Sequence, residues 1–408
     1  KALMSQDLGS SYSKRRRIAI IVTLGLLTGL GPFTIDLYLP AFPSLKGDLG
    51  ITDAQVQVTL SATTLGFALG QLVIGPWSDR IGRRIPLMVA SSLHVTASVL
   101  VAVAPNVEFL TAMRALQGIG AAGGAVVAMA MARDLFGGRA LVKTLARLSL
   151  ISGLAPILAP IVGSWMVTVM SWRGIFWGLA LYGAVIIALV LRFTVETRPP
   201  AERTRGGIGP LLASFRTVLS DRVFVGALMV ASFGFAGLFS YVSTSSVLLQ
   251  EVYGLTAQGF GAVFAVCSIG IFVGVQTGAR IALRIGSHWM IAIGNTVTIL
   301  AATGVVLVGV FDGPLVTLVP CMFAFTLGFG FCAPNNNVLA LQNHRKTSGV
   351  ASSLMGSSSM LAGSLVGPII GSFELNDATP MGAAMLICSS LAGVALWLVL
   401  RPHRFPKR

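Results

Sequence analysis

Long apolar stretches recur along this chain and constrain its fold more than any other feature. A helix needs roughly 20 predominantly apolar residues to cross a bilayer. Charged or turn-rich breaks, such as those at 78–80 and 312–313, separate stretches of that length. The expected fold is therefore an all-α membrane protein with twelve transmembrane helices. The predicted spans are 18–39, 56–76, 86–104, 108–131, 144–168, 172–193, 223–247, 258–282, 288–309, 314–338, 348–373 and 379–400.

The composition leaves no room for a large soluble domain. Only 11% of the 408 residues are charged, against about 25% in a typical soluble protein. All four cysteines fall within predicted spans and show no metal-ligand spacing. We expect them to be small packing residues, with no disulfide and no metal site.

Basic residues gather on alternate loops. The opposite loops hold only Lys46 and Arg173. Because Lys and Arg are enriched in cytoplasmic loops, both termini are expected in the cytoplasm. The net charge of +15 then faces anionic lipid head groups, and no nucleic-acid partner is expected. The basic segments are 14–17, 80–84, 133–147, 192–222, 280–284, 345–346 and 401–408.

The chain divides into two halves. The longest polar stretch predicts a cytoplasmic linker at 196–221, between six-helix bundles at 1–195 and 222–408. Gly70 and Gly82 align with Gly274 and Gly286 at one offset, and residues 159–164 align with 367–372 at a nearly equal one. Two parallel six-helix repeats with a site at their interface describe one large class of secondary transporters.

Two charged residues inside the predicted spans stand out, Asp36 in the first span and Arg114 in the fourth. A charge at a membrane helix centre costs on the order of 3 kcal/mol, and such residues are usually functional. We expect Asp36 to take up and release protons, and Arg114, which stays protonated, to pair with it. The alternatives are an acid that reaches the outer surface and an ion pair with a structural role alone.

Residues 75–84 form the turn between spans 2 and 3. Its glycines permit a tight turn, and its charges can hold a neighbouring helix end in one conformation and release it in another. The alternative is a basic turn that only sets topology. The predicted gate residues are Gly75, Asp79, Arg80, Gly82, Arg83 and Arg84.

Span 5 carries two prolines one helical turn apart. Each removes a backbone donor and bends the helix, and the small residues around them permit close packing. The alternative is an ordinary kinked membrane helix. The motif residues are Gly153, Pro156, Pro160 and Gly163.

Polar and aromatic side chains punctuate several spans. Polar groups are costly against lipid and are expected to face a cavity. Either they contact a substrate there or they only pack between helices. The predicted cavity residues are Asp36, Tyr38, Gln117, Tyr241 and Asn335.

Together these segments resemble the major facilitator superfamily over nearly the whole chain. Residues 75–84 resemble its signature between helices 2 and 3, residues 114–120 its helix-4 arginine motif, and residues 153–163 its helix-5 antiporter motif. Other segments resemble the drug:proton antiporters of the bicyclomycin-resistance (Bcr/CflA) branch. These are 34–43, 67–72, 159–163, 171–177 and 232–240.

The resemblance implies two pseudosymmetric six-helix bundles, a cavity lined by helices 1, 4, 7 and 10, and export driven by inward proton flow. It assigns proton and substrate coupling to Asp36, its support to Arg114, and the cytoplasmic gate to Asp79 and Arg80. The chain departs from the antiporter motif at Ala159, where glycine is usual, and it has no second acid in helix 1. The second departure favours one proton per cycle.

The sequence therefore predicts a proton-coupled antiporter, and not an enzyme, that exports small amphiphilic drugs or antibiotics of the bicyclomycin or chloramphenicol kind. We expect a multi-pass monomer in the bacterial cytoplasmic (inner) membrane, driven by the proton gradient without a cofactor. The alternatives are an exporter or facilitator of a metabolite (an amino acid, dipeptide or sugar) and a membrane receptor that does not transport. No Ser/His/Asp cluster, HExxH or P-loop favours an enzyme.

Overall fold

Helices make up all the regular structure of the described residues. The computed structural model describes residues 12–203, 208–344 and 347–404, and in that part of the chain it contains no strand. Twelve of the described helices are long and apolar enough to cross a membrane, so the predicted all-α fold with twelve spans is confirmed. They are α1 (Lys14–Asp36), α3 (Asp53–Ile81), α4 (Arg84–Ala102), α5 (Val107–Leu135), α6 (Gly138–Val169), α7 (Trp172–Phe193), α9 (Arg222–Val247), α10 (Ala257–Ile285), α11 (Ser287–Val310), α12 (Leu315–Leu341), α13 (Ser348–Gly371) and α14 (Thr379–Ala395).

Two shorter helices were not predicted. The first expected span, 18–39, ends early because α1 stops at Asp36, and a 3₁₀ turn then leads into α2 (Phe42–Leu49). Pro40 and Pro43 stand in the first turn of these two elements, where proline needs no backbone donor. The predicted linker 196–221 contains α8 (Ile208–Leu219). Of the predicted basic segments, residues 205, 345–346 and 405–408 lie outside the described residues.

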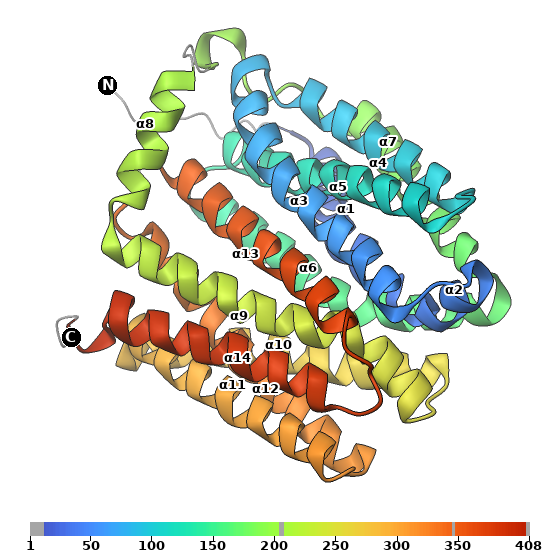
Figure 1. Ribbon diagram of the computed structural model, residues 1–408. Helices are drawn as coiled ribbons and strands as arrows, with labels where there is room; N and C mark the ends of the chain where they lie inside the picture. The colour runs from blue at the N-terminus through green and yellow to red at the C-terminus, as the bar shows by residue number, and fades with distance from the viewer. Residues whose placement is uncertain (1–11, 204–207, 345–346, 405–408) are drawn as a thin grey trace.

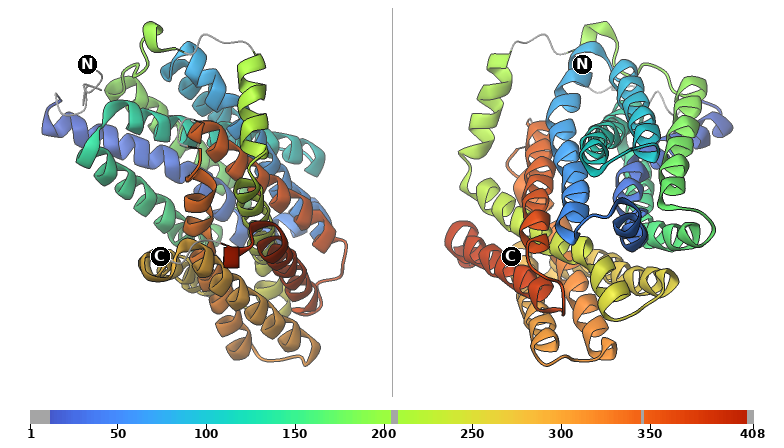
Figure 2. Two further views of the ribbon diagram at one scale, coloured as in Figure 1. Left: turned by 90° about the vertical axis from the view of Figure 1, so that its left-hand side faces the viewer. Right: turned by 45° about the vertical axis from the view of Figure 1, so that its right-hand side comes forward.

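The helices pack in two groups, with α1 and α3–α7 in one and α9–α14 in the other. The groups meet along two seams, where α3 packs against α13 and α6 against α10. Figure 1 shows α13 beside α3, and the right view of Figure 2 shows the same two helices side by side. A site between the groups is therefore bounded by these two seams.

The internal repeat is visible in the backbone. Gly82 ends α3 with a φ of 104°, and its predicted counterpart Gly286 ends α10 with a φ of 90°. Side chains disfavour this region, so both turns are built on glycine.

The two ends of the helix bundle differ in charge. The start of α1, the Gly82 turn and α8 lie at one end, here named the basic end because the basic segments gather there (Figure 1). The connection through α2 and the turn between α9 and α10 lie at the opposite end, here named the far end.

Candidate functional site

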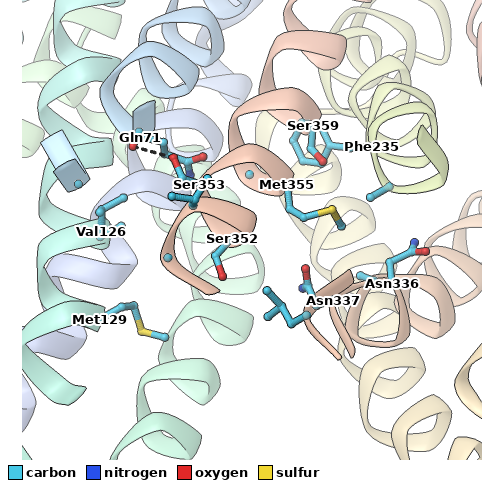
Figure 3. A pocket seen from close by; sticks show the side chains of 18 of the residues that line it. Gln71, Val126, Met129, Phe235, Asn336, Asn337, Ser352, Ser353, Met355 and Ser359 are labelled. Carbon is cyan, nitrogen blue, oxygen red and sulfur yellow. Dashed lines mark hydrogen bonds between the residues drawn. The ribbon is translucent and has the colours of Figure 1, made fainter. Parts of the chain in front are cut away.

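A cavity of about 950 Å³ lies between the two helix groups at the basic end. The uncharged residues among its described lining include phenylalanines, methionines, amides and hydroxyls. Figure 3 shows Gln71 and Ser353 on one side of it and Phe235 and Asn336 on the other. The charged residues of the lining all come from the first group, near its α3–α4 turn and the end of α5: Asp79, Arg80, Arg83, Arg133 and Asp134.

The turn after α3 is fastened within its own helix group. The Arg83 guanidinium pairs with Asp79 at 2.7 Å and with Asp134 at the end of α5 at 2.9 Å. Asp79 also pairs with Arg198 at 2.7 Å. Four of the predicted gate residues, Gly75, Asp79, Arg80 and Arg83, line the cavity mouth, while Gly82 and Arg84 do not.

Glu196 holds the other side of this turn. Its carboxylate accepts the backbone N–H groups of Arg83 at 2.8 Å, Arg84 at 3.2 Å and Arg198 at 2.9 Å. Partial burial alone would raise the pKa of Glu196, but these three donors and the charge of Arg203 lower it below its ordinary value. The turn is thereby tied to the chain that leaves α7.

The far end of the protein is closed by contacts between the two groups. Ser246 Oγ donates to the Leu39 carbonyl at 2.5 Å, and Gln250 Nε2 donates to the Pro40 carbonyl at 3.3 Å. Lys46 Nζ lies 2.7 Å from Glu251 Oε2, and among the described residues this is the one ion pair that joins the groups. The cavity is therefore open at the basic end and sealed at the far end.

Asp36 lies at the last residue of α1, and its side chain is 7% exposed. In the described part of the chain its carboxyl makes no hydrogen bond and no ion pair. The predicted pairing with Arg114 is not formed in this conformation. Tyr241, on α9 of the other group, lies within electrostatic reach of Asp36.

Arg114 uses other partners because the backbone of α1 comes within its reach. Its Nη1 donates to the Thr34 carbonyl at 3.1 Å and to Gln117 Oε1. The guanidinium lies 4.7 Å from the Tyr38 ring centroid and 5.4 Å from that of Phe176, and such stacking stabilises a desolvated cation. Its Nε and Nη2 have no partner among the described residues, so Arg114 keeps two donors free.

A buried histidine for which no role was predicted completes this network. His94 on α4 lies 3.0 Å from Thr34 Oγ1. The Thr34 hydroxyl proton is directed to the Leu30 carbonyl at 2.6 Å, so His94 Nε2 must be the donor. Ser98 in turn accepts from Gln117 Nε2 at 2.8 Å. The available signal was that His94, alone of the four histidines, stands in the middle of a predicted span.

The predicted substrate residues do not line the open cavity. Four of them, listed here, are buried toward the closed far end, where Ser246 of α9 contacts the 3₁₀ turn after α1: Asp36, Tyr38, Gln117 and Tyr241. Asn335 is buried beside the cavity on α12. Asn335 turns its Nδ2 to the Phe331 carbonyl of its own helix at 2.8 Å, and its neighbours Asn336 and Asn337 face the cavity. The predicted cavity residues that lie outside its lining in this conformation are Asp36, Tyr38, Gln117, Tyr241 and Asn335.

The two prolines of α6 leave a backbone carbonyl available for a hydrogen bond across the α6–α10 seam. Pro160 has no N–H to give to the carbonyl one turn earlier, which belongs to Pro156. Ser268 Oγ of α10 donates to that carbonyl at 3.1 Å. Further along α6, a Cβ on Gly163 would lie 2.2 Å from the Leu37 carbonyl oxygen. Gly153 lies against Phe272 of α10. The motif therefore serves both the seam and the packing of α6 against the end of α1 in its own group.

Comparison with known proteins gives consistent matches over nearly the whole chain. The family model described as Major Facilitator Superfamily matches residues 24–366. An uncharacterized MFS-type transporter, YdgK of Bacillus subtilis (strain 168), is 34% identical over 386 residues, which cover 94% of this chain and 96% of the relative. The bicyclomycin resistance protein homolog of Haemophilus influenzae is 28% identical, over 93% and 95% of the two chains.

A further relative and two solved structures extend this pattern. The multidrug resistance protein MdtL of Escherichia coli K12 is 29% identical, over 92% and 94% of the two chains. The inward-facing bacterial homolog of the human lysosomal transporter Spinster superposes with a TM-score of 0.73 at 17% identity, over 96% and 98% of the chains. The partially occluded inward-open xylose transporter XylE from Escherichia coli gives 0.75 at 14% identity, over the same shares. At these identities the two structures bear on the fold alone.

Proposed function

This chain belongs to the Major Facilitator Superfamily, and we propose that it is a proton-coupled antiporter that exports small amphiphilic compounds across the bacterial cytoplasmic membrane. Family membership makes it a multi-pass membrane transporter rather than an enzyme. The proposal concerns the direction of transport, the coupling ion and the class of substrate.

The closure of one end supports alternating access. The cavity is open between the groups at the basic end, while hydrogen bonds and the Lys46–Glu251 ion pair join the groups at the far end. The positive-inside rule places the basic end in the cytoplasm. A substrate would then load from the cytoplasm in this conformation and leave after the far-end contacts break.

The unpartnered carboxyl of Asp36 is the observation on which proton coupling rests. A buried carboxyl with no partner is stable only while neutral, and it can ionise once water or a cation reaches it. Asp36 ends α1 three residues before Leu39, whose carbonyl accepts from Ser246 of α9, so opening the far end would change its surroundings. Proton uptake from the far side and release in the state that binds substrate would link the two flows.

Arg114 supports this cycle as a fixed positive charge. Its guanidinium is hydrogen-bonded to Thr34 and Gln117 and stacked on Tyr38. Thr34 precedes Asp36 by two residues on α1, so the fixed charge lies near that carboxyl. Its two free donors can receive the Asp36 carboxylate after a change of conformation. We therefore propose that the predicted ion pair forms in another state of the cycle.

The class of substrate follows from the cavity and from the relatives. The neutral, aromatic and amide-bearing walls suit an amphiphilic compound with hydrogen-bonding groups. Two of the relatives are named for resistance to bicyclomycin and to multiple drugs. We propose compounds of the bicyclomycin or chloramphenicol kind, carried by a monomer that needs no cofactor.

A drug-susceptibility panel in an efflux-deficient bacterial host tests the proposal. Wild type is expected to raise the inhibitory concentration of some amphiphilic antibiotics, and Asp36→Asn to abolish that gain at equal amounts of protein in the membrane. Glu108→Gln, which neutralises an exposed acid at the start of α5, is the matched control and should stay protective. Equal protection by wild type and Asp36→Asn would contradict proton coupling through this residue. No protection by wild type against any compound would contradict drug export and favour a metabolite as substrate.

A further inference from the structure

A second cavity, of about 420 Å³, lies between α6 and α10. Apolar side chains form much of it, among them Leu150 and Phe272, and hydroxyl and amide groups from Ser149 and Gln276 stand beside them. Leu150 is 45% exposed, and Gln276 and Ser149 are also exposed. The cavity is therefore a groove that opens sideways from the seam, toward the surface that faces the bilayer.

Four basic side chains stand at the basic end of this groove. Arg280 and Arg284 follow Gln276 by one and two turns on α10, and Arg147 and Lys143 precede Leu150 by one and two turns on α6. All four are exposed. Among the described residues no acid forms an ion pair with any of them. Positive charge thus stands beside an apolar groove at the basic end of the seam.

We propose that this groove binds an anionic phospholipid, with its phosphate at Lys143, Arg147, Arg280 and Arg284 and an acyl chain along Leu150 and Phe272. Basic pockets between membrane helices on the positively charged side are suited to phospholipid head groups. The exposed hydroxyl of Ser149 and amide of Gln276 can donate to the ester oxygens between head group and chain. A zwitterionic lipid offers the same chain but no net negative charge for the four cations.

The groove lies in a seam between the two helix groups, so a bound lipid is sensitive to conformation. Closing the basic end requires α6 and α10 to approach each other there, and the groove would narrow. A lipid that binds the open groove better than the closed one shifts the protein toward the conformation described above. Anionic lipid is therefore expected to slow closure at the basic end.

Native mass spectrometry of the full chain, titrated with phosphatidylglycerol or phosphatidylcholine of the same acyl chains, tests this inference. Wild type is expected to retain phosphatidylglycerol at least several-fold better. The double variant Arg147→Gln/Arg280→Gln should lose most of that preference. Lys14→Gln/Arg15→Gln, which removes the same charge from exposed residues at the start of α1, should keep it.

A second variant separates the groove from surface charge in general. Ser149→Trp places a large ring in the groove and leaves all four cations in place, so it should lower retention of both lipids. Equal loss in the two double variants, or unchanged retention in Ser149→Trp, would overturn the inference. Because the assay measures binding without transport, its outcome does not depend on the substrate or on the coupling ion.

Discussion

The ion pair between Lys46 and Glu251 gives the far-end closure a measurable energy. Lys46 also pairs with Asp53 of its own group, so its charge stays compensated when Glu251 is neutralised. The Lys46 and Glu251 side chains are 20% and 36% exposed, and partly exposed pairs contribute about 0.2–1 kcal/mol. Glu251→Gln should therefore raise the ratio of far-end-open to far-end-closed protein by roughly 1.4-fold to fivefold.

Distances between spin labels measured by pulsed electron paramagnetic resonance report this ratio directly. Labels at Gly47 and Gln258, exposed positions in the two groups at the far end, would be placed in a background without the four native cysteines. The longer-distance population should be larger in Glu251→Gln than in wild type. This difference between the two proteins should become smaller at high salt, where exposed charges are screened. Asp53→Asn is the control, since it removes a partner of Lys46 without touching the contact between groups. An equal shift in both variants, or none in Glu251→Gln, would refute the reasoning.

Three further predictions concern stability. Arg83→Gln should lower the free energy of unfolding by about 2 kcal/mol, because its buried guanidinium pairs with two partly exposed carboxylates; thermal unfolding in detergent measures this. Glu196 has a pKa below its ordinary value of 4.5. The extra free energy of unfolding of wild type over Glu196→Gln should therefore be largest above pH 4.5 and should decrease as the pH falls below it. Unfolding measured at several pH values shows the sign. Gly163→Ala should cost about 1–3 kcal/mol by overpacking against the Leu37 carbonyl, while an unchanged melting temperature would contradict that contact.

The sequence could predict the helices because their signal is local. About twenty apolar residues between charged breaks suffice to identify a span, and the positions of Gly82 and Gly286 follow from the turn that each must form. The early end of α1 at Asp36 was missed because apolar residues continue past it through a 3₁₀ turn and α2. Apolar composition alone does not distinguish a straight span from one that bends.

The contacts within the candidate site could not be predicted in the same way. Arg114 bonds to the Thr34 carbonyl rather than to Asp36, and no sequence pattern records how one helix is rotated against its neighbour. The cavity contains Asn336 and Asn337 but not Asn335, a difference of one residue around α12. Burial of the residues around Asp36 also depends on long-range contacts, because bonds between the two groups seal the far end.

Transport against an imposed pH gradient in proteoliposomes tests the central claim, proton-coupled antiport through Asp36, most directly. The purified wild-type protein, with an exported drug supplied on the basic-end side, should accumulate the drug only when the opposite side is more acidic, and each drug movement should be matched by a proton movement in the other direction. Asp36→Asn should still exchange drug for drug while losing all response to the gradient, and Glu108→Gln should behave as wild type. Gradient-driven accumulation by Asp36→Asn at the wild-type rate would contradict the account.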